Sequence, residues 1–137
     1  MLDTSVLVAG VRSPSGASWA VLQAAQQHQF RMAASQALFL EYEQVLNRAE
    51  HGLSSLFVAE LLADLAALID PIEIYYRWRP QLPDADDEMV LEAAVNGQVR
   101  AIVTHNRRDF ERAARRFGIH VWSPAALLWA LREGKTE

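Results

Sequence analysis

The apolar positions of this chain follow two patterns, short apolar runs and steps of three or four residues. The clearest helical stripe follows Ser35, where Leu38, Tyr42 and Leu46 recur on one face. Strand-like runs are shorter, and the run over residues 101–104 is nearly all apolar. Turn-forming residues and short links separate the two kinds of segment, so strands and helices alternate along the chain.

This alternation predicts the elements and their ends. Strands are expected in a short segment ending at Asp3 and over residues 30–34, 72–78, 101–104 and 119–122. Helices are expected after Ser18, after Ser35, over residues 56–68, from Asp86 or Asp87 to about residue 95, over 107–117 and over 124–132. Ser54 and Ser123 are expected caps, and Gly118 is an expected stop. The pattern predicts an α/β fold, a three-layer α/β/α arrangement with a mostly parallel central sheet, in one domain over residues 1–137.

Composition narrows the class of protein. The 51% apolar and 22% charged residues are ordinary for a globular chain, and no apolar run approaches the roughly 20 residues that span a bilayer. The absence of cysteine excludes disulfides, thiolate metal sites and cysteine nucleophiles, and it fits a cytoplasmic location. A net charge of −4 argues against binding nucleic acid by bulk positive charge, so a nuclease needs local arginines and a bound cation.

Several polar residues are expected at one edge of the predicted sheet. Asp3, Thr104 and Asn106 follow strands, and the carboxyl ends of parallel strands share an edge. Helices that lead into such strands begin near the same edge, which brings Glu41 and Asp87 there. Converging carboxylates repel one another unless a cation binds, and oxygen ligands without cysteine select Mg²⁺ or Mn²⁺. Such an ion can activate water for phosphodiester hydrolysis.

Each candidate also has an ordinary structural explanation. An acid at the position of Asp84 or Asp86 is about as often a turn residue or helix cap as a member of a functional site, and Asp109 could cap the helix beside it. Glu41 could be solvated next to its apolar face. His105 could serve acid–base chemistry, but with no partner visible it is interpreted as a loop residue. The combination of acids therefore carries more weight than any one of them.

Four segments, taken in order, carry a family resemblance: LDTSVLVAG, SQALFLEYEQVL, DADDEMVLEAA and IVTHNRRDF. In order and spacing they resemble the signature blocks of the PIN-domain ribonucleases, most of all the toxin components of toxin–antitoxin pairs. The likeness covers essentially the whole chain. It implies a PIN-like α/β/α fold, an RNA substrate, a prokaryotic cytoplasmic protein, frequent homodimers and inhibition by an antitoxin protein.

The resemblance also implies roles for single residues. Three acids match the family's ligands for Mg²⁺ or Mn²⁺: Asp3, Glu41 and Asp87. The other members of the implied catalytic pocket are Asp84, Asn106 and Asp109. The hydroxyl side chains expected to support them are Thr4, Ser5 and Thr104. Hydrolysis by such a pocket leaves a 3′-hydroxyl and a 5′-phosphate.

Two positions depart from the family pattern. Ser5 stands where the family usually has Asn, which changes the hydrogen bonding that orients Asp3. Asn106 is uncharged where many members have Asp, so a second metal would be held weakly or through Asp109. Together with the very short first strand, which raises the expectation of a natural start upstream of Met1, these departures bear on whether the pocket is active.

Six arginines between residues 100 and 116 concentrate positive charge after the acidic segment. Arg107 and Arg108, beside the candidate site, are expected to contact RNA phosphates or acidic residues of an antitoxin. Arg112, Arg115 and Arg116 could equally form a solvated helix face. The four tryptophans are spread over different elements, which favours core or dimer packing.

Three functions are consistent with these observations. The first is a Mg²⁺- or Mn²⁺-dependent endoribonuclease that is the toxin of a toxin–antitoxin pair. The second is a PIN-like module that has lost catalysis and acts through protein partners. The third is a phosphohydrolase of small phosphate esters, which the fold and the acids alone permit. RNA cleavage, metal binding and turnover of a chromogenic phosphate monoester distinguish the three.

Overall fold

The computed structural model describes residues 1–77 and 81–134. Its elements, in chain order, are α1 (Thr4–Arg12), α2 (Ala17–Gln26), β1 (Met32–Ser35), α3 (Gln36–Leu46), the short 3₁₀ helix η1 (Ala49–His51), α4 (Ser55–Leu68), β2 (Ile69–Ile72), α5 (Ala85–Asn96), β3 (Ala101–Val103), α6 (Arg107–Arg116), β4 (His120–Trp122) and α7 (Pro124–Arg132). None of the helices in the described ranges combines the length and the apolar character needed to cross a lipid bilayer.

Every strand pairing in the described ranges is parallel. β1 pairs with β2, with Met32 opposite Ile69, and β3 pairs with β4, with Ala101 opposite His120. The start of the chain joins β3 through a single parallel bridge between Leu2 and Val103. The predicted first strand is therefore only a bridge long, as its two residues before the first acid suggested.

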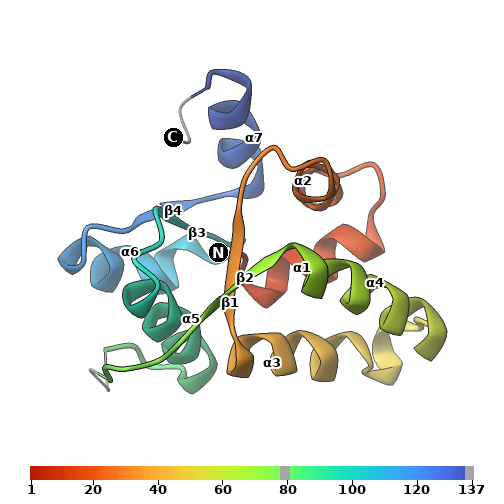
Figure 1. The fold of residues 1–137 in the computed structure, drawn as a ribbon, viewed down its shortest axis with the longest axis horizontal. Helices are drawn as coiled ribbons and strands as arrows, with labels where there is room; N and C mark the ends of the chain where they lie inside the picture. Colours follow the sequence, from red (N-terminus) through yellow and green to blue (C-terminus); the bar gives the residue numbers. More distant parts are fainter. Residues whose placement is uncertain (78–80, 135–137) are drawn as a thin grey trace.

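The strands lie in the middle of the molecule between helices. Figure 1 shows α5 and α6 on one side of the strands and α1, α2 and α4 on the other, with α3 below and α7 above. This arrangement confirms the predicted α/β class with three layers. Because the strands are parallel, their carboxyl ends share edges, and polar residues that follow them can be brought together.

Three serines end in the capping positions expected from the sequence. The hydroxyl oxygens of Ser35, Ser54 and Ser123 accept hydrogen bonds from the third backbone N–H group after each of them, at 3.1–3.2 Å. Each bond satisfies one of the N–H groups left open at a helix start. Gly118 follows α6 with φ of +71°, a left-handed conformation that favours glycine.

Two predicted caps are wrong. Ser18 lies inside α2, which begins at Ala17, and its hydroxyl bonds to a histidine from another element instead. Neither Asp86 nor Asp87 caps α5, because that helix begins at Ala85. The residue before it is Asp84, whose backbone carbonyl accepts from the N–H of Glu88 at 3.0 Å. Acids in the first turn of a helix are favourable near the positive end of the helix dipole, whichever residue caps the helix. The acidic segment therefore does not fix the first residue of α5 to better than about one turn.

The strand expected over residues 72–78 is also wrong. β2 ends at Ile72, and its proline is tolerated because β2 pairs on one side with β1 only. Beyond it, the side chain of Asn96 takes the place of a neighbouring strand. Its Oδ1 accepts from the N–H groups of Tyr75 and Tyr76, both at 2.9 Å, and its Nδ2 donates to the carbonyl of Tyr76 at 2.9 Å. Trp78, the last residue of the predicted strand, lies outside the described residues.

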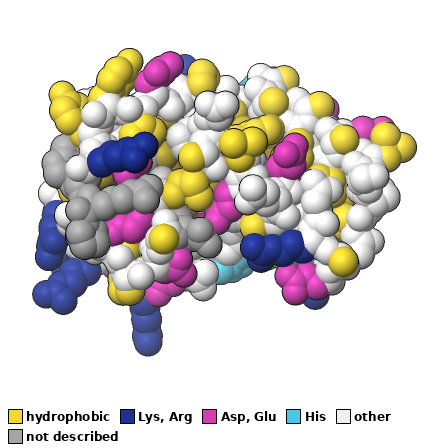
Figure 2. Space-filling model, turned by 90° about the horizontal axis from the view of Figure 1, so that it is seen from below, with side chains coloured by type: hydrophobic (Ala, Val, Ile, Leu, Met, Phe, Trp, Pro, Cys, Tyr) yellow, Lys and Arg dark blue, Asp and Glu magenta, His cyan; other side chains and the backbone are white. Residues whose placement is uncertain are grey.

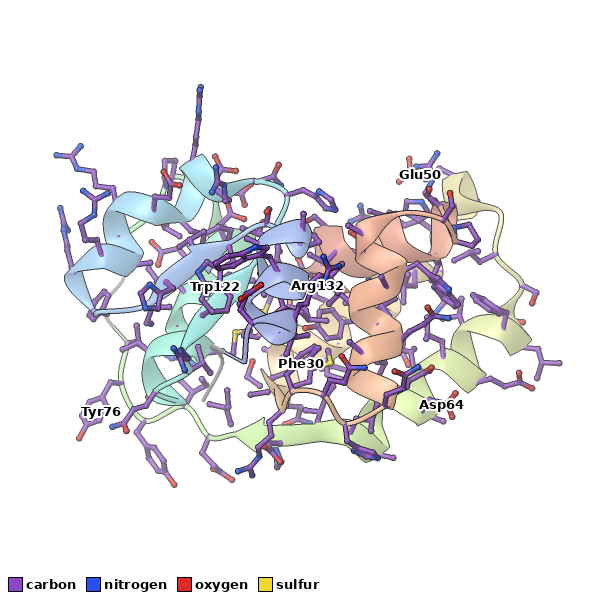
Figure 3. All side chains as sticks on the ribbon, turned by 90° about the horizontal axis from the view of Figure 1, so that it is seen from above. Phe30, Glu50, Asp64, Tyr76, Trp122 and Arg132 are labelled. Carbon is purple, nitrogen blue, oxygen red and sulfur yellow. The ribbon has the colours of Figure 1, made fainter. Side chains whose placement is uncertain are left out.

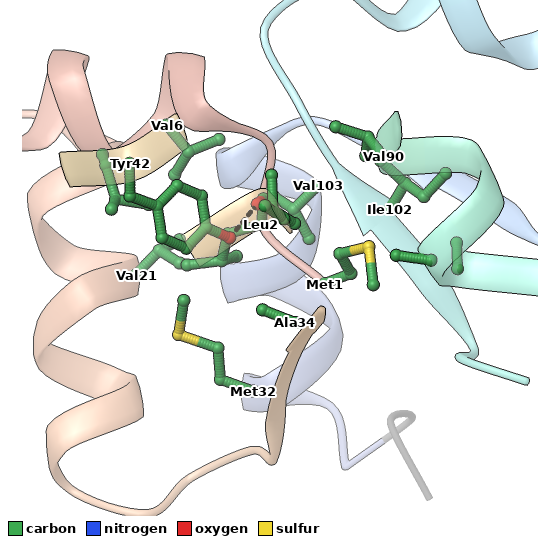
Figure 4. Packing of buried hydrophobic residues seen from close by; sticks show 14 of the residues in the cluster. Met1, Leu2, Val6, Val21, Met32, Ala34, Tyr42, Val90, Ile102 and Val103 are labelled. Atoms are coloured by element: carbon green, nitrogen blue, oxygen red, sulfur yellow. Dashed lines mark hydrogen bonds between the residues drawn. The ribbon is translucent and has the colours of Figure 1, made fainter. Parts of the chain in front are cut away.

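The core joins the start of the chain to helices from both sides. Figure 4 shows the side chains of Val6, Val21 and Tyr42 gathered around Leu2, and those of Val90 and Ile102 beyond them. Trp19 and Trp122 are half-buried against this core, as expected for packing. Trp129 instead is exposed on α7.

In a chain that starts at Met1, the amino group of Met1 is buried and should make stability depend on pH. It donates to the carbonyl of Ala101 at 3.1 Å, and burial lowers its pKa from 8.0 to about 5 because the charged form loses hydration. Between pH 5 and pH 8 the unfolded chain binds a proton that the folded chain does not. We therefore expect the free energy of unfolding to rise over this window by on the order of a few kcal/mol, measured by urea titration at each pH.

The matched control is the same chain with an acetylated amino group, which carries no titratable proton. Between pH 5 and pH 8 its free energy of unfolding should rise by less than that of the unmodified protein, and the difference is the contribution of the Met1 amino group. An equal rise in both proteins would contradict the assignment, since the remaining titratable groups would then account for all of it.

Candidate active site

Four of the sequence-predicted acids line a hollow of about 700 Å³, which we call the site pocket. Its walls come from α1, α3, η1, the start of α5 and the turn between β3 and α6. The predicted site residues that line it are Asp3, Thr4, Ser5, Glu41, Asp84, Asp87 and Asn106. A larger hollow of about 880 Å³, beside β1 and β2, is lined by none of the predicted site residues. The candidate chemistry therefore lies in the smaller of the two.

Asp3 is held at the floor of the site pocket by the first strand segment. Its N–H donates to the carbonyl of Val103 at 2.9 Å, and its side chain is 7% exposed. The carboxylate oxygen Oδ2 accepts from the hydroxyls of Ser5 at 2.9 Å and Thr104 at 2.7 Å. Although Asp3 precedes α1, it makes no side-chain capping bond, and no described residue donates to Oδ1. Oδ2 is thus held by two hydrogen bonds, while Oδ1 is available to bind a metal ion or substrate.

Glu41 is positioned by a hydrogen bond of its own and by the anchoring of its neighbour Tyr42. Its Oε2 accepts from the Thr4 hydroxyl at 2.5 Å. The next residue, Tyr42, is fully buried and donates from its hydroxyl to the carbonyl of Leu2 at 2.5 Å. Burial, and then the nearby carboxylates of Asp3 and Glu41, raise the pKa of Tyr42 well above its usual value, so the phenol keeps the proton that it donates. These bonds tie α3 to the strand segment that carries Asp3.

Two acids reach the pocket from the start of α5. Asp84 is exposed just before the helix, and Asp87 is half-buried in its first turn. Both line the site pocket with Asp3 and Glu41. The side chain of Asp86 lies outside the described part of the structure, so its predicted role as an alternative acid stays a prediction.

A further acid, Glu88, shapes this wall and was not singled out from the sequence. It is buried, and its Oε1 accepts from the backbone N–H groups of Gln81 and Leu82, the latter at 2.7 Å. The bonds tie the loop before Asp84 onto α5. The only signal in the sequence is its place one residue after Asp87, which by helical spacing turns it away from the same face.

The turn after β3 completes the site with a chain of hydroxyl and backbone bonds. Thr104 is fully buried, and its Oγ1 accepts from the N–H of Asn106 at 3.0 Å while donating to Asp3. The N–H of His105 donates to the Ser5 hydroxyl at 3.3 Å, and its Nε2 lies 2.7 Å from the Ser18 hydroxyl. His105 therefore has a partner that the sequence pattern did not show, and it links α2 to this turn.

Three exposed residues among those predicted lie beside the pocket and do not line it. Asp109 is exposed in the first turn of α6, and Arg107 and Arg108 are exposed at the same end. Basic side chains project outward from α6 in Figure 3, and Figure 2 shows them extending from the edge of the molecule where α6 lies. Asp109 can act on a ligand in the pocket only from its rim.

The oxygen atoms of the pocket fit a hard divalent cation without forming a complete cage. No three acidic or imidazole side chains in the described ranges lie close enough together to hold a metal by themselves. Mg²⁺ does not require such a cage, since it keeps several waters and uses one or two carboxylates plus substrate phosphate. Asp3, whose Oδ1 is open, and either Glu41 or Asp87 on the same walls supply that number.

Loss of the Thr104 hydroxyl should weaken metal binding. Thr104→Val keeps the shape of the side chain but removes the bond to Asp3 Oδ2 and the acceptor for Asn106. Removing a group that orients a ligand typically lowers metal affinity about 10- to 100-fold. Titration calorimetry with Mn²⁺ measures the change, and Thr104→Ser, which keeps the hydroxyl, should restore affinity. Equal affinity of the valine and serine variants would argue against an orienting role.

Comparison with models of protein families gives a match. The family model described as PIN domain matches residues 1–108, which include every residue of the site pocket. No curated protein and no solved structure matches the chain.

Proposed function

The chain belongs to the PIN domain family, whose members are generally nucleases, and from this premise we propose that it is a metal-dependent endoribonuclease. The observation that carries the proposal is the carboxylate of Asp3. One of its oxygens is fixed by two hydroxyl donors, and the other is open in a pocket that Glu41 and Asp87 also line.

The residues of this chain would divide the work as follows. Asp3, Glu41 and Asp87, together with water and substrate phosphate, would hold Mg²⁺ or Mn²⁺, and such an ion would polarise a phosphoryl oxygen and activate water. Asp84 and Asn106 line the same pocket and orient the substrate and the attacking water. Water adds across the bond between phosphorus and the 3′ oxygen, which leaves a 3′-hydroxyl and a 5′-phosphate.

The Ser5 departure favours this function over a module without catalysis. Ser5 donates to Asp3 Oδ2 at 2.9 Å and accepts from the N–H of His105. The shorter side chain thus makes the orienting bond for which an amide side chain is otherwise expected. Asn106 keeps an oxygen at the pocket wall, although without charge, which favours one tightly held metal.

RNA cleavage with Mn²⁺ tests the proposal, with wild type compared with Asp87→Asn. We expect cleavage by the wild type and little by the variant, because the half-buried carboxylate of Asp87 faces the site pocket. Equal cleavage by both would sink the assignment. Turnover of a chromogenic phosphate monoester without RNA cleavage would instead identify a phosphohydrolase of small esters.

We further propose that the protein is the toxin of a toxin–antitoxin pair, a cytoplasmic homodimer held inactive by a small antitoxin. The likeness of its four sequence blocks to the toxin group supports this role. The exposed Arg107 and Arg108 beside the pocket are available to RNA phosphates or to acidic antitoxin residues. A neighbouring reading frame for a small DNA-binding protein whose product blocks RNA cleavage is the expected finding.

A further inference from the structure

The site pocket extends well beyond the acids, along a groove between α1 and α3. Ser5 and Arg12 are seven residues apart on α1, whereas Glu41 lies on α3 and Arg48 lies just beyond the end of that helix. Seven residues are about two helical turns, so Ser5 and Arg12 lie on one face of α1, about 10 Å apart. Figure 1 shows both helices starting near the strands and running in the same direction. All four residues line the site pocket.

The far end of this groove is basic, in contrast to the acidic end. Arg12 and Arg48 are exposed, and no described carboxylate forms an ion pair with either of them. They lie at the ends of two different helices, which the shared pocket wall brings together. In a chain with a net charge of −4, two free guanidinium groups on one wall mark a place for an anion.

His51 is the second, independent observation at this end. Its side chain is 8% exposed, and neither ring nitrogen has a hydrogen-bond partner among the described residues. Glu50, the preceding residue, is mostly exposed, and its Oε1 lies 3.9 Å from Nε2, too far for a hydrogen bond. Figure 3 places Glu50 at the tip of the molecule, beside the end of α1. Buried imidazole nitrogens without partners are unfavourable, and a ligand at this end of the site pocket, which His51 lines, would supply one.

We propose that Arg12, Arg48 and His51 form a phosphate-binding subsite for an RNA strand whose scissile phosphate lies at the acidic end of the groove. The inference rests on the proposed function and adds where the strand runs. Guanidinium groups bind phosphate oxygens through two parallel hydrogen bonds, and an imidazole keeps at least one N–H donor in either protonation state. The offset of about 10 Å places the bound group a short way along the strand from the cut.

The first experiment measures RNA binding at a series of salt concentrations. It uses a 10-nucleotide single-stranded RNA and fluorescence anisotropy, in an Asp87→Asn background that leaves the RNA uncut. Each phosphate contact that is lost should reduce the slope of log affinity against log salt by about 0.7. We expect this reduction for Arg12→Gln and for Arg48→Gln. Arg132→Gln, which removes the same charge from an exposed position on α7, should leave the slope unchanged.

The second experiment uses inorganic phosphate alone and does not depend on cleavage. The imidazole NMR signals of His51, assigned by their absence from His51→Phe, should shift saturably with phosphate and stay fixed in the Arg12→Gln/Arg48→Gln double variant. A shift with unchanged RNA slopes would overturn the RNA assignment in favour of a free phosphate. No shift and unchanged slopes would overturn the subsite. Reduced slopes, together with a wild-type protein that cleaves no RNA with Mn²⁺, would keep the subsite and reject the nuclease proposal.

The variant His51→Phe separates a ligand-binding role from a structural one. Phenylalanine fills similar space without unpartnered nitrogens, so we expect a higher melting temperature. RNA binding should nevertheless become about tenfold weaker, the usual order for one charge-assisted hydrogen bond. A more stable protein with unchanged RNA and phosphate binding would remove His51 from the subsite.

Discussion

Replacement of Asp3 by asparagine should lower the rate of metal-dependent RNA cleavage by on the order of 1,000-fold. A bound metal ion contributes several kcal/mol to such a reaction, and each 1.36 kcal/mol corresponds to a factor of ten in rate. The variant keeps an oxygen that can accept from Ser5 and Thr104, so the local fold should persist. It loses the charge on Asp3 Oδ1, the oxygen that no described residue engages. Single-turnover cleavage with saturating RNA and varied Mn²⁺ measures both rate and metal affinity.

Asp109→Asn is the matched control for this change. It removes the same charge from an exposed residue in the first turn of α6, outside the walls of the site pocket. We expect its rate to stay within about threefold of wild type, since it can act on a ligand only from the rim. A loss as large as that of Asp3→Asn would move the centre of the site toward α6 and would favour a second metal there.

Truncation of Tyr42 should have the largest effect on stability. Tyr42→Ala removes a fully buried aromatic ring between α3 and the start of the chain, which typically destabilises by about 3–5 kcal/mol. Tyr42→Phe keeps the ring but leaves the carbonyl of buried Leu2 without its donor, which should lower the free energy of unfolding by about 1–3 kcal/mol. Urea denaturation measures both values.

The same variants report on how Glu41 is held. Tyr42 ties α3, which carries Glu41, to the strand segment that carries Asp3. Tyr42→Phe should therefore weaken Mn²⁺ binding even under conditions in which the variant is fully folded. Tyr75→Phe on the exposed segment after β2 is the control, and it should change stability by less than about 0.5 kcal/mol. Equal stability of the two phenylalanine variants would show that the bond to Leu2 contributes nothing.

The predictions that depended on local chemistry agree with the structure. Ser35, Ser54 and Ser123 cap helices because a side-chain oxygen next to an open N–H group acts over three residues, whatever surrounds it. The apolar stripe of α3 is buried for the same kind of reason, since its spacing matches the helical repeat. Local patterns of this kind can be recognised in the sequence without knowing which elements pack against them.

The predictions that failed depended on partners far along the chain. The alternating residues after β2 resemble a strand, but Asn96 holds their backbone, and nothing in the pattern marks that residue as a substitute for a strand. Ser18 precedes an apolar stripe as a cap would, yet its hydroxyl bonds to His105, 87 residues away. Nothing in the sequence marks His51 as a binding residue, and only the burial of its ring nitrogens without partners among the described residues draws attention to it.

The sequence by itself determined the α/β class and the family, because alternation and ordered motifs are properties of the chain, and it predicted which acids act. Only the tertiary structure decided which of these groups meet. It brought Glu41 and Asp87 to the walls around Asp3 and left Asp109 on the rim. It also set Arg12 and Arg48 at the other end of the same groove. Distances between elements depend on how helices pack on parallel strands, and that packing is a sum of many small contacts that no single motif encodes.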